Sequence, residues 1–328
     1  MRLTKYSLVT AVSVLCAAAA APGASADVMK ARLAQNLSPI SGVAIVAQQK
    51  GFFAKRGLEI TVSNFTSGKQ CLNTVIGGGA DIATTAEAPT TAAAMAKQPI
   101  AFLARMEYSD LKTLTAATSG IASKPGLKGK KIAFTAGTGS EVYTMSLLKA
   151  AGLGKDDVTL VNLRPQDMLP ALSAGSIDAY NTWEPHIANG KKTLTDKVKE
   201  LDTRGIYAET FNIVVMRPYL EANPELIDRF LRALIDAEGW MKANPEDAIT
   251  VVASTVGMKR QDLAPIWPDY IYHVVLDDKQ MGILQAHASW RLASGNHPPG
   301  AVMPDFKTVV EPGPLKKIDP KRVTAAGL

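Results

Sequence analysis

The chain has 328 residues; 47% are hydrophobic, 20% are charged, and the formal net charge is +6. This composition is ordinary for a globular protein, so it excludes disorder and a coiled coil over most of the length. At roughly 150 residues per domain, the length predicts about two domains. Two cysteines cannot make a disulfide framework or a Cys-rich metal site, and no cluster of lysine and arginine predicts a nucleic-acid surface.

Residues 1–26 have the pattern of a secretory signal peptide. Arg2 and Lys5 form a positive start, residues 8–21 are apolar without a charge, and Ala24-Ser25-Ala26 matches a cleavage signal. The apolar run is shorter than the ~18 residues that a membrane-spanning helix requires. We therefore predict an exported, periplasmic protein whose signal peptide is removed after residue 26.

The next part of the chain alternates strand and helix patterns. Leu58, Ile60 and Val62 alternate with polar residues, which is the period of a half-buried strand, and Gly77-Gly78-Gly79 is typical of a helix stop. From such patterns we expect strands at 28–35, 58–65, 82–85, 100–106 and 111–115, and helices at 42–53, 68–76 and 87–97.

A stretch rich in Ser, Lys, Gly and Pro at 119–129 predicts a crossing into a second domain. A compact β-α-β-α-β pattern follows, with strands expected at 131–135, 158–163 and 177–182 and helices at 141–151 and 168–174. The chain is expected to return near 203–208 and to form a strand at 212–216. Three later helices are expected to begin at Asn223-Pro224, Asn244-Pro245 and Asp277-Asp278.

These elements predict an α/β fold of two lobes, joined by two crossovers, with a ligand cleft between them. We expect lobe 1 to comprise 27–118 and 207–300, lobe 2 to comprise 119–206, and 301–328 to form a C-terminal tail that packs on lobe 1. Strands alternating with helices predict parallel sheets, whose ligands bind beyond the carboxyl ends of the strands. The candidate site segments are therefore the strand-to-helix junctions 36–39, 66–68, 85–89, 135–141 and 183–185.

Several junctions place Ser, Thr or Gly at a helix start, as at Ser38, Ser67 and Thr138. A helix start presents unpaired N–H groups and the positive end of the helix dipole, which suit an oxyanion. The same residue types also serve as plain helix caps, so only convergence of two or more junctions on one cleft would favour binding. Trp183 could wall a ligand beside Glu184, or it could fill the core of its own lobe.

Enzyme motifs are scarce. Gly137-Thr138-Gly139 lacks the third glycine of a dinucleotide fingerprint, since Val142 stands in its place, and neither a P-loop nor a G-x-S-x-G elbow is present. The four histidines have no metal-ligand spacing. We therefore predict no catalytic residue, no cofactor and no metal. We expect Cys71, the lone cysteine after the signal peptide, to be a small buried or half-buried residue, with a reactive thiol as the alternative.

An ordered set of short motifs runs from residue 51 to residue 185. The motifs are Gly51-Phe52-Phe53, Gly57-Leu58-Glu59-Ile60, Gly78-Gly79-Ala80-Asp81-Ile82-Ala83, Leu127-Lys128-Gly129-Lys130-Lys131-Ile132-Ala133, Gly137-Thr138-Gly139-Ser140-Glu141, Leu163-Arg164-Pro165-Gln166-Asp167-Met168, Gly175-Ser176-Ile177-Asp178-Ala179 and Trp183-Glu184-Pro185. Each is weak alone, but in this order they resemble solute-binding proteins of ABC importers. The resemblance is to the nitrate, sulfonate, taurine and thiamine-precursor group, which has a type II periplasmic binding fold.

The resemblance implies a two-lobed clamp that closes on a small molecule, docks on an ABC permease in the inner membrane and catalyses no reaction. It also implies a monomer without a nucleic-acid partner. Carried over by position, the ligand-binding residues would be Ser38, Pro39, Ser67, Gly68, Thr85, Ala86, Glu87, Thr138, Gly139, Ser140, Trp183 and Glu184. Related pyrimidine-precursor synthases carry a Cys-rich segment, and the lone Cys71 departs from that pattern.

The ligand class stays open. A sulfonate, a taurine-like solute or another oxyanion is favoured, because helix starts suit it. However, Glu87, Glu141 and Glu184 could all face the cleft. Like charges ~4 Å apart repel by about 4 kcal/mol at an effective dielectric of 20, which is half of a micromolar binding energy of about 8 kcal/mol. The cations that could compensate are Arg105, Arg164 and Lys69.

If those cations point away from the cleft, we expect a pyrimidine-like, aromatic or amine-bearing ligand instead. Two functions of other classes also stay open. One is an exported hydrolase that uses Ser140 and a cleft histidine, and the other is a sensor subunit that presents its closed form to a membrane receptor.

Overall fold

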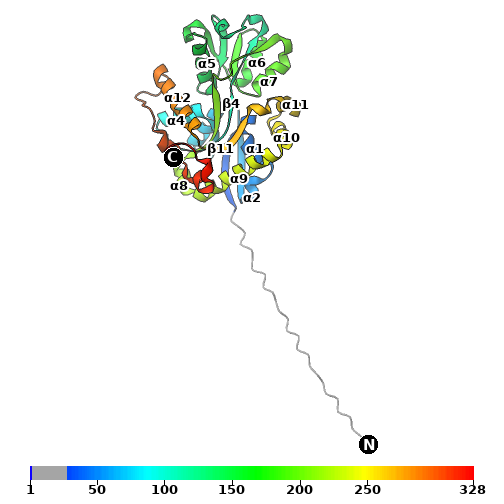
Figure 1. Cartoon of the computed structure of the whole chain (residues 1–328), viewed down its shortest axis with the longest axis vertical. Helices are drawn as coiled ribbons and strands as arrows, with labels where there is room; N and C mark the ends of the chain where they lie inside the picture. The colour runs from blue at the N-terminus through cyan, green and yellow to red at the C-terminus, as the bar shows by residue number, and fades with distance from the viewer. Residues whose placement is uncertain (2–27) are drawn as a thin grey trace.

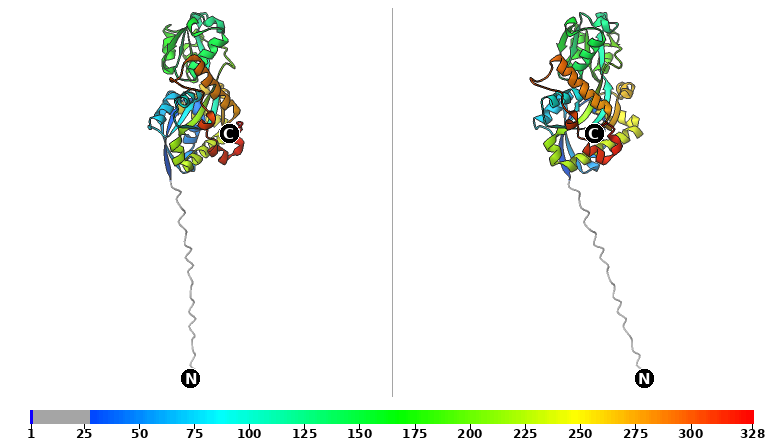
Figure 2. Two further views of the ribbon diagram at one scale, coloured as in Figure 1. Left: turned by 90° about the vertical axis from the view of Figure 1, so that its left-hand side faces the viewer. Right: turned by 60° about the vertical axis from the view of Figure 1, so that its left-hand side comes forward.

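The computed structural model describes Met1 and residues 28–328, so the predicted signal peptide lies outside the described residues. The described chain forms two lobes, each built on its own β-sheet (Figure 1). The lobe that carries α5, α6 and α7 lies at one end of the other, and both further views keep this arrangement (Figure 2). No helix within residues 28–328 is both long and apolar enough to cross a bilayer.

The first sheet has six strands in the order β11-β4-β10-β3-β1-β2. Its strands are β1 (Met29–Asn36), β2 (Leu58–Phe65), β3 (Ile82–Ala86), β4 (Ile100–Asp110), β10 (Ala208–Met216) and β11 (Ile271–Val275). β1 pairs in parallel with β2 and β3, whereas β10 is antiparallel to β3 and β4. The prediction of parallel sheets is therefore correct only in part, because β10 brings the chain back from the second lobe and runs against its neighbours.

The second sheet has five strands in the order β7-β6-β8-β5-β9. Its strands are β5 (Lys112–Ala116), β6 (Lys131–Phe134), β7 (Thr159–Asn162), β8 (Ala179–Thr182) and β9 (Val198–Leu201). β6 pairs in parallel with β7 and β8, and β5 is antiparallel to both β8 and β9.

The chain crosses between the lobes earlier than the sequence pattern predicts. β4 ends at Asp110 in the first sheet, and β5 begins at Lys112 in the second. The first crossing is therefore at Leu111 and not at the polar stretch 119–129. It lies inside an apolar strand pattern, because a strand can continue from one sheet into the next without a loop. The second crossing lies between β9 and β10, where the sequence predicts it.

Helices cover both sheets. Figure 1 shows α4 and α12 on one side of the first sheet and α1, α9 and α10 on the other, and the helix contacts agree. The helices are α1 (Gly42–Gln49), α2 (Phe52–Lys55), α3 (Gly68–Ile76), α4 (Glu87–Met95), α5 (Gly139–Ala150), α6 (Pro165–Ser173), α7 (His186–Leu194), α8 (Arg217–Ala222), α9 (Pro224–Ala243), α10 (Pro245–Val256), α11 (Arg260–Leu263), α12 (Asp278–Ser294), α13 (Phe306–Val309) and α14 (Gly313–Ile318). The C-terminal segment packs on lobe 1, where the Glu311 N–H donates to the Phe102 carbonyl at 2.9 Å.

The predicted helix at 42–53 is two helices in the structure, α1 and α2. Gly51 separates them with a φ of +70°, a left-handed conformation that glycine adopts at little cost. Several elements have no counterpart in the sequence prediction: α7, α8, α11, β9 and β11, together with α13 and α14 in the C-terminal tail.

Candidate functional site

A small cavity lies between the two lobes, where several strand-to-helix junctions meet. Lobe 2 contributes Thr138 and Trp183 to its lining. Lobe 1 contributes Asn36, Ile40, Ser67, Gly68, Lys69, Ala86, Pro89, Glu209 and Phe211. The space open to the centre of a water molecule is only about 10 Å³, close to the least that one water needs, so the lobes are almost shut on each other.

The start of α3 forms one wall of this cavity. Ser67 caps the helix, because its hydroxyl accepts a hydrogen bond from the Gln70 N–H. Gly68 packs directly on β3: a Cβ there would lie 2.9 Å from the backbone nitrogen of Ala86 and 2.9 Å from the Cα of Thr85. The Thr85 hydroxyl is buried and donates to the Gly68 carbonyl at 2.8 Å. Thr85 therefore holds α3 against β3 and does not line the cavity.

The start of α5 faces this wall from the other lobe. The Thr138 hydroxyl accepts from the Ser140 N–H at 3.2 Å and donates to the Thr135 carbonyl at 2.7 Å. The buried Ser140 hydroxyl donates to the Asn181 carbonyl at 2.6 Å and accepts from the Thr135 N–H at 3.0 Å. Ser140 is therefore bonded to backbone groups on both sides, and within residues 28–328 no histidine forms a hydrogen bond with its hydroxyl.

The Glu184 carboxylate points away from the cavity, although Trp183 beside it lines the cavity. It accepts hydrogen bonds from the Ala188 N–H at 2.8 Å and from Lys112 Nζ at 3.2 Å. Burial raises the pKa of Glu184, and the nearby Lys112 opposes that rise. The contact of Glu184 with lobe 1 is made by its backbone carbonyl, which accepts from the Ser38 hydroxyl at 2.9 Å.

The Glu87 carboxylate is held behind the cavity by the return strand β10. It accepts from the Thr210 N–H at 2.6 Å and the Thr210 hydroxyl at 2.9 Å, and Tyr207 donates a further hydrogen bond to it. Burial raises the pKa of Glu87, and the Tyr207 hydrogen bond opposes that rise. His287 lies behind this group, with Nε2 2.8 Å from the Tyr207 hydroxyl.

Five of the twelve residues expected at the site line the cavity: Ser67, Gly68, Ala86, Thr138 and Trp183. The other seven are not part of the lining. Among them, the side chains of Ser38, Thr85 and Ser140 donate to backbone carbonyls near the cavity. Asn36 and Pro89 lie in junction segments that the sequence indicated, but Ile40, Glu209 and Phe211 do not. Glu209 and Phe211 alternate along β10, a strand expected to begin only at 212.

The three cations that could neutralise an anionic ligand are engaged elsewhere. Arg105 is buried and forms an ion pair with Asp277, and the exposed Arg164 pairs with Asp167 at 2.7 Å. Lys69 lines the cavity, but its Nζ donates across the cleft to the Ala136 carbonyl at 3.2 Å. Of these three cations, only Lys69 lines the cavity, and its ammonium group is already hydrogen-bonded. The same lining contains the Glu209 carboxylate, which carries the opposite charge when it is ionised.

Further polar contacts hold the lobes together around the cavity. Asn296 donates to Glu141 at 2.9 Å, and Lys192 forms an ion pair with Asp262. Together with the Ser38 and Lys69 contacts, they join residues far apart in the sequence. This is a closed arrangement of the two lobes.

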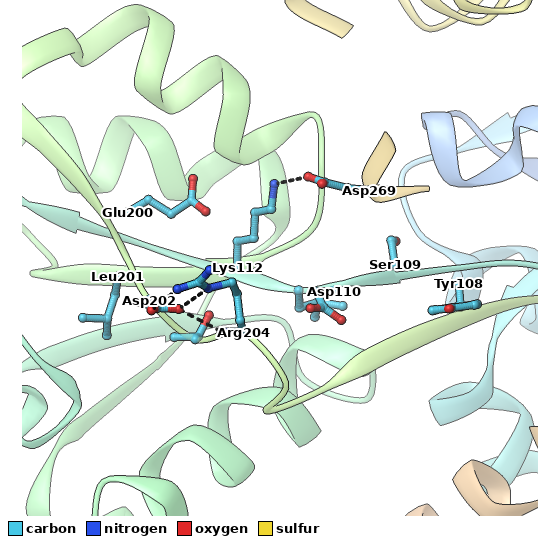
Figure 3. Close-up of a pocket in the computed structure, with 11 residues that line it drawn as sticks. Tyr108, Ser109, Asp110, Lys112, Glu200, Leu201, Asp202, Arg204 and Asp269 are labelled. Carbon is cyan, nitrogen blue, oxygen red and sulfur yellow. Dashed lines mark hydrogen bonds and ion pairs between the residues drawn. The ribbon is translucent and has the colours of Figure 1, made fainter. Parts of the chain in front are cut away.

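A second, larger hollow of about 570 Å³ lies at the crossovers (Figure 3). It is formed by residues 108–112, residues 200–204 and Asp269. Figure 3 shows Lys112 extending toward Asp269, to which it donates at 2.8 Å, and Arg204 beside Asp202. Both chain crossings line this hollow, so it lies at the connection between the lobes and shares no lining residue with the cavity.

Cys71 is fully buried, and burial raises the pKa of its thiol. Within residues 28–328, no three His, Cys, Asp or Glu side chains gather in a way that could hold a metal ion.

Residues 39–248 match the family model described as NMT1/THI5 like. The taurine-binding periplasmic protein of Escherichia coli is 28% identical over 207 residues, which are 61% of this chain and 63% of that protein. The alkanesulfonate-binding protein SsuA of Xanthomonas axonopodis pv. citri, solved with bound MOPS, superposes with a TM-score of 0.76 at 21% identity, covering 88% of this chain and all of that one. The periplasmic nitrate-binding protein NrtA of Synechocystis gives a TM-score of 0.72 at 15% identity, covering 90% and 86%. The predicted two-lobed periplasmic binding fold is thereby confirmed.

Proposed function

Because the chain belongs to the NMT1/THI5-like family, we propose that it is a periplasmic solute-binding protein of an ABC importer. It captures a small organic solute between its lobes and delivers the solute to a permease in the inner membrane. The observation that carries the proposal is the cavity at which the starts of α3 and α5, one from each lobe, converge. The closed cavity has room for about one water, so a solute held there keeps the lobes slightly further apart while it contacts both of them. These contacts favour the closed arrangement over an open one.

The closed form explains how binding is reported to a permease. Ser38 and Lys69 of lobe 1 bond backbone carbonyls of lobe 2 only when the lobes meet. A solute in the cavity adds contacts to the same closed state, so it shifts the population toward that state. A permease that recognises the closed surface then distinguishes loaded from empty protein.

Among solutes that its relatives bind, a taurine-like zwitterion suits this cavity better than a simple anion. The backbone N–H groups at the start of α3 suit its sulfonate, and the Glu209 carboxylate in the cavity lining suits its amine. Nitrate or a simple alkanesulfonate has no group that compensates Glu209.

A thermal-shift screen of the mature protein tests the capture function. The panel contains taurine, ethanesulfonate, nitrate, benzylamine and 4-aminopyrimidine. A solute present at 100 times its Kd stabilises the folded protein by about 2.7 kcal/mol. The expected result is a raised melting temperature with at least one member, confirmed as one-to-one binding by calorimetry. An unchanged melting temperature with all of them contradicts the proposal for these solute classes.

A further inference from the structure

The cavity between the lobes presents acceptor groups that no part of the described chain satisfies. Glu209 is 4% exposed, lines the cavity, and has no hydrogen-bond partner for its carboxylate among the described residues. Asn36 is 2% exposed and lines the same cavity, and no residue in the described part of the chain donates to its buried Oδ1. A buried acceptor without a donor is unfavourable, so both atoms are suited to N–H or O–H groups of a bound molecule.

The hydroxyls of the cavity are, by contrast, used within the protein. The Ser67 hydroxyl caps α3, and the Thr138 hydroxyl both caps α5 and donates to the Thr135 carbonyl. The Lys69 ammonium already donates to a carbonyl of the opposite lobe. The groups that remain for a ligand are therefore mainly acceptors, and one of them is a carboxylate.

The place of Glu209 also bears on which charge the ligand carries. A Cβ on Gly139, the first residue of α5, would lie 2.8 Å from Glu209 Oε1. The carboxylate of the protein therefore lies against the start of α5, which is the position that an oxyanion of a ligand would take. An anion bound there would stand beside Glu209 and be repelled by it.

Two more buried carboxyl groups, those of Glu87 and Glu107, lie behind Glu209, and burial raises the pKa of both. Glu107 lies opposite Phe211 in the pairing of β4 with β10, is fully buried, and has no hydrogen-bond partner on its carboxylate oxygens within residues 28–328, although Arg105 lies near it. Glu87 is fully buried on α4. Burial raises the pKa of Glu209, and the charge of Glu87 adds to that rise. A cation in the cavity would offset this repulsion.

We propose that Glu209 binds a cationic N–H group of the solute, such as a protonated amine, and that Asn36 Oδ1 accepts a second N–H. The apolar body of the solute lies against Trp183 and Phe211, one from each lobe. The face of Trp183 favours a nearby cation. This inference rests on the proposed function and narrows the solutes to those that carry such a nitrogen.

Calorimetric titration with a matched pair of solutes tests the role of Glu209. Taurine and isethionate share a sulfonate on a two-carbon chain, but isethionate has a hydroxyl in place of the amine. Benzylamine is a third probe that carries an amine without a sulfonate. The proteins are the wild type, Glu209→Gln, Glu209→Asp and, as a control with the same charge change, Glu59→Gln, whose exposed carboxylate pairs with Lys30 on lobe 1.

We expect the wild type to bind taurine or benzylamine, and to bind taurine at least tenfold more tightly than isethionate. We expect Glu209→Gln to weaken binding of the amine probes at least tenfold. Its affinity for isethionate should be equal to that of the wild type or higher. Glu209→Asp, which keeps the charge, should recover part of the affinity, and Glu59→Gln should match the wild type. Melting curves by circular dichroism establish that each variant is folded.

Three outcomes overturn the inference: isethionate binding as tightly as taurine, amine affinity unchanged in Glu209→Gln, or no amine probe binding the wild type. If a solute without an amine binds the wild type, the capture function stands and only the assignment to Glu209 fails. If no solute of either kind binds, the inference and the proposed function fail together.

Discussion

At the scale of single residues, the buried Glu209 carboxylate makes the stability of the ligand-free protein depend on pH. Burial raises its pKa well above the usual range, and Glu87 adds to the rise. Its surroundings are Glu87, Glu107, Tyr207 and the Lys69 ammonium, so negative groups dominate. An unfolded glutamate loses its proton near pH 4.3, whereas the folded one retains it to higher pH. The folded state then binds more protons, and stability falls as the pH rises through that window.

We therefore predict that Glu209→Gln removes this pH dependence. The variant should be more stable than the wild type at pH 8 by about 1–3 kcal/mol, the range for relief of an unsatisfied buried polar group. At pH 5 the difference should shrink. Urea unfolding at both pH values measures it. An equal difference at pH 5 and pH 8, or a less stable variant at pH 8, would contradict the prediction.

His287 is expected to give the opposite pH dependence. It is buried beside Tyr207, and burial lowers its pKa to about 3. In the unfolded chain histidine takes up a proton near pH 6.5, so below that value the unfolded state binds the extra proton. The contribution of neutral His287 to the free energy of unfolding is fully present above pH 6.5. It is lost as the pH falls from 6.5 toward 3, by about 1.4 kcal/mol per pH unit.

His287→Gln should reduce the loss of unfolding free energy between pH 6.5 and pH 4.5 by about 2 kcal/mol or more. Denaturant unfolding at several pH values gives the slope of the unfolding free energy against pH. His297→Gln is the matched control, because His297 is partly exposed and its Nδ1 bonds only the adjacent Pro298 carbonyl within the described residues. Identical slopes in the wild type and His287→Gln would show that His287 does not carry the effect.

The candidate residues at helix starts were predictable because cap chemistry is local. Ser67 and Thr138 lie where a strand pattern gives way to a helix pattern, and both line the cavity. The direction of a side chain is not local. Glu87 and Glu184 occupy junctions that the sequence indicated, yet both carboxylates are turned to backbone N–H groups of neighbouring segments. Glu209 was missed because the predicted strand begins only at 212, whereas β10 begins at Ala208.

At the scale of elements, the docking of α3 on β3 depends on the absence of a side chain at Gly68. A Cβ there would meet backbone atoms of Thr85 and Ala86 at 2.9 Å, and these cannot rotate away. We predict that Gly68→Ala lowers the free energy of unfolding by about 1–3 kcal/mol, the usual range for overpacking. It should also weaken solute binding, because α3 forms one wall of the cavity.

Gly282→Ala in α12 is the matched control for this substitution. Nothing lies within 4 Å of a Cβ at Gly282, so alanine there should be neutral or stabilise the helix by up to about 1 kcal/mol. Thermal unfolding of the two variants separates the packing effect from helix propensity. If Gly68→Ala is as stable as Gly282→Ala, α3 does not pack on β3 as described.

Element identity followed from the sequence better than element connection. The strands around Leu58 and Ile132 and the helix from Pro224 to Ala243 were predictable, because each has a clear apolar period. β11 was not, since its five residues lie between Pro-rich and polar segments and are paired only through β4. The first crossing was missed for a different reason: β4 and β5 form a nearly continuous extended segment, and their sequence does not specify the sheet in which each pairs.

At the scale of the whole molecule, the two lobes are separate cores joined at a hinge. A large and a small apolar cluster fill lobe 1, and two further clusters fill lobe 2. The contacts between lobes are mostly polar, such as Ser38 with the Glu184 carbonyl and Asn296 with Glu141. Polar contacts exchange readily with water, so opening costs far less than unfolding either lobe. This difference is what a binding protein needs in order to open and close reversibly.

Lys112 contributes to the balance between open and closed forms, because it forms an ion pair between the lobes beside the chain crossing. It is the first residue of β5, and its Nζ bonds both Glu184 of its own lobe and Asp269 of lobe 1. Asp269 is nearly half exposed, so solvent weakens the pair, and its expected contribution to closure is about 0.5–1 kcal/mol. Lys112→Gln should therefore weaken solute binding about two- to fivefold, since apparent affinity follows the closed population.

Small-angle X-ray scattering and calorimetry of the same samples measure this effect. Lys112→Gln should have a larger radius of gyration than the wild type without ligand and should need more solute to reach the compact form. Lys191→Gln is the control, because this substitution removes the same charge. Lys191 pairs with Glu200 at 2.9 Å entirely within lobe 2. A change that is equal in the two variants would assign the effect to net charge, and no change in Lys112→Gln would mean that the Asp269 pair does not hold the lobes together.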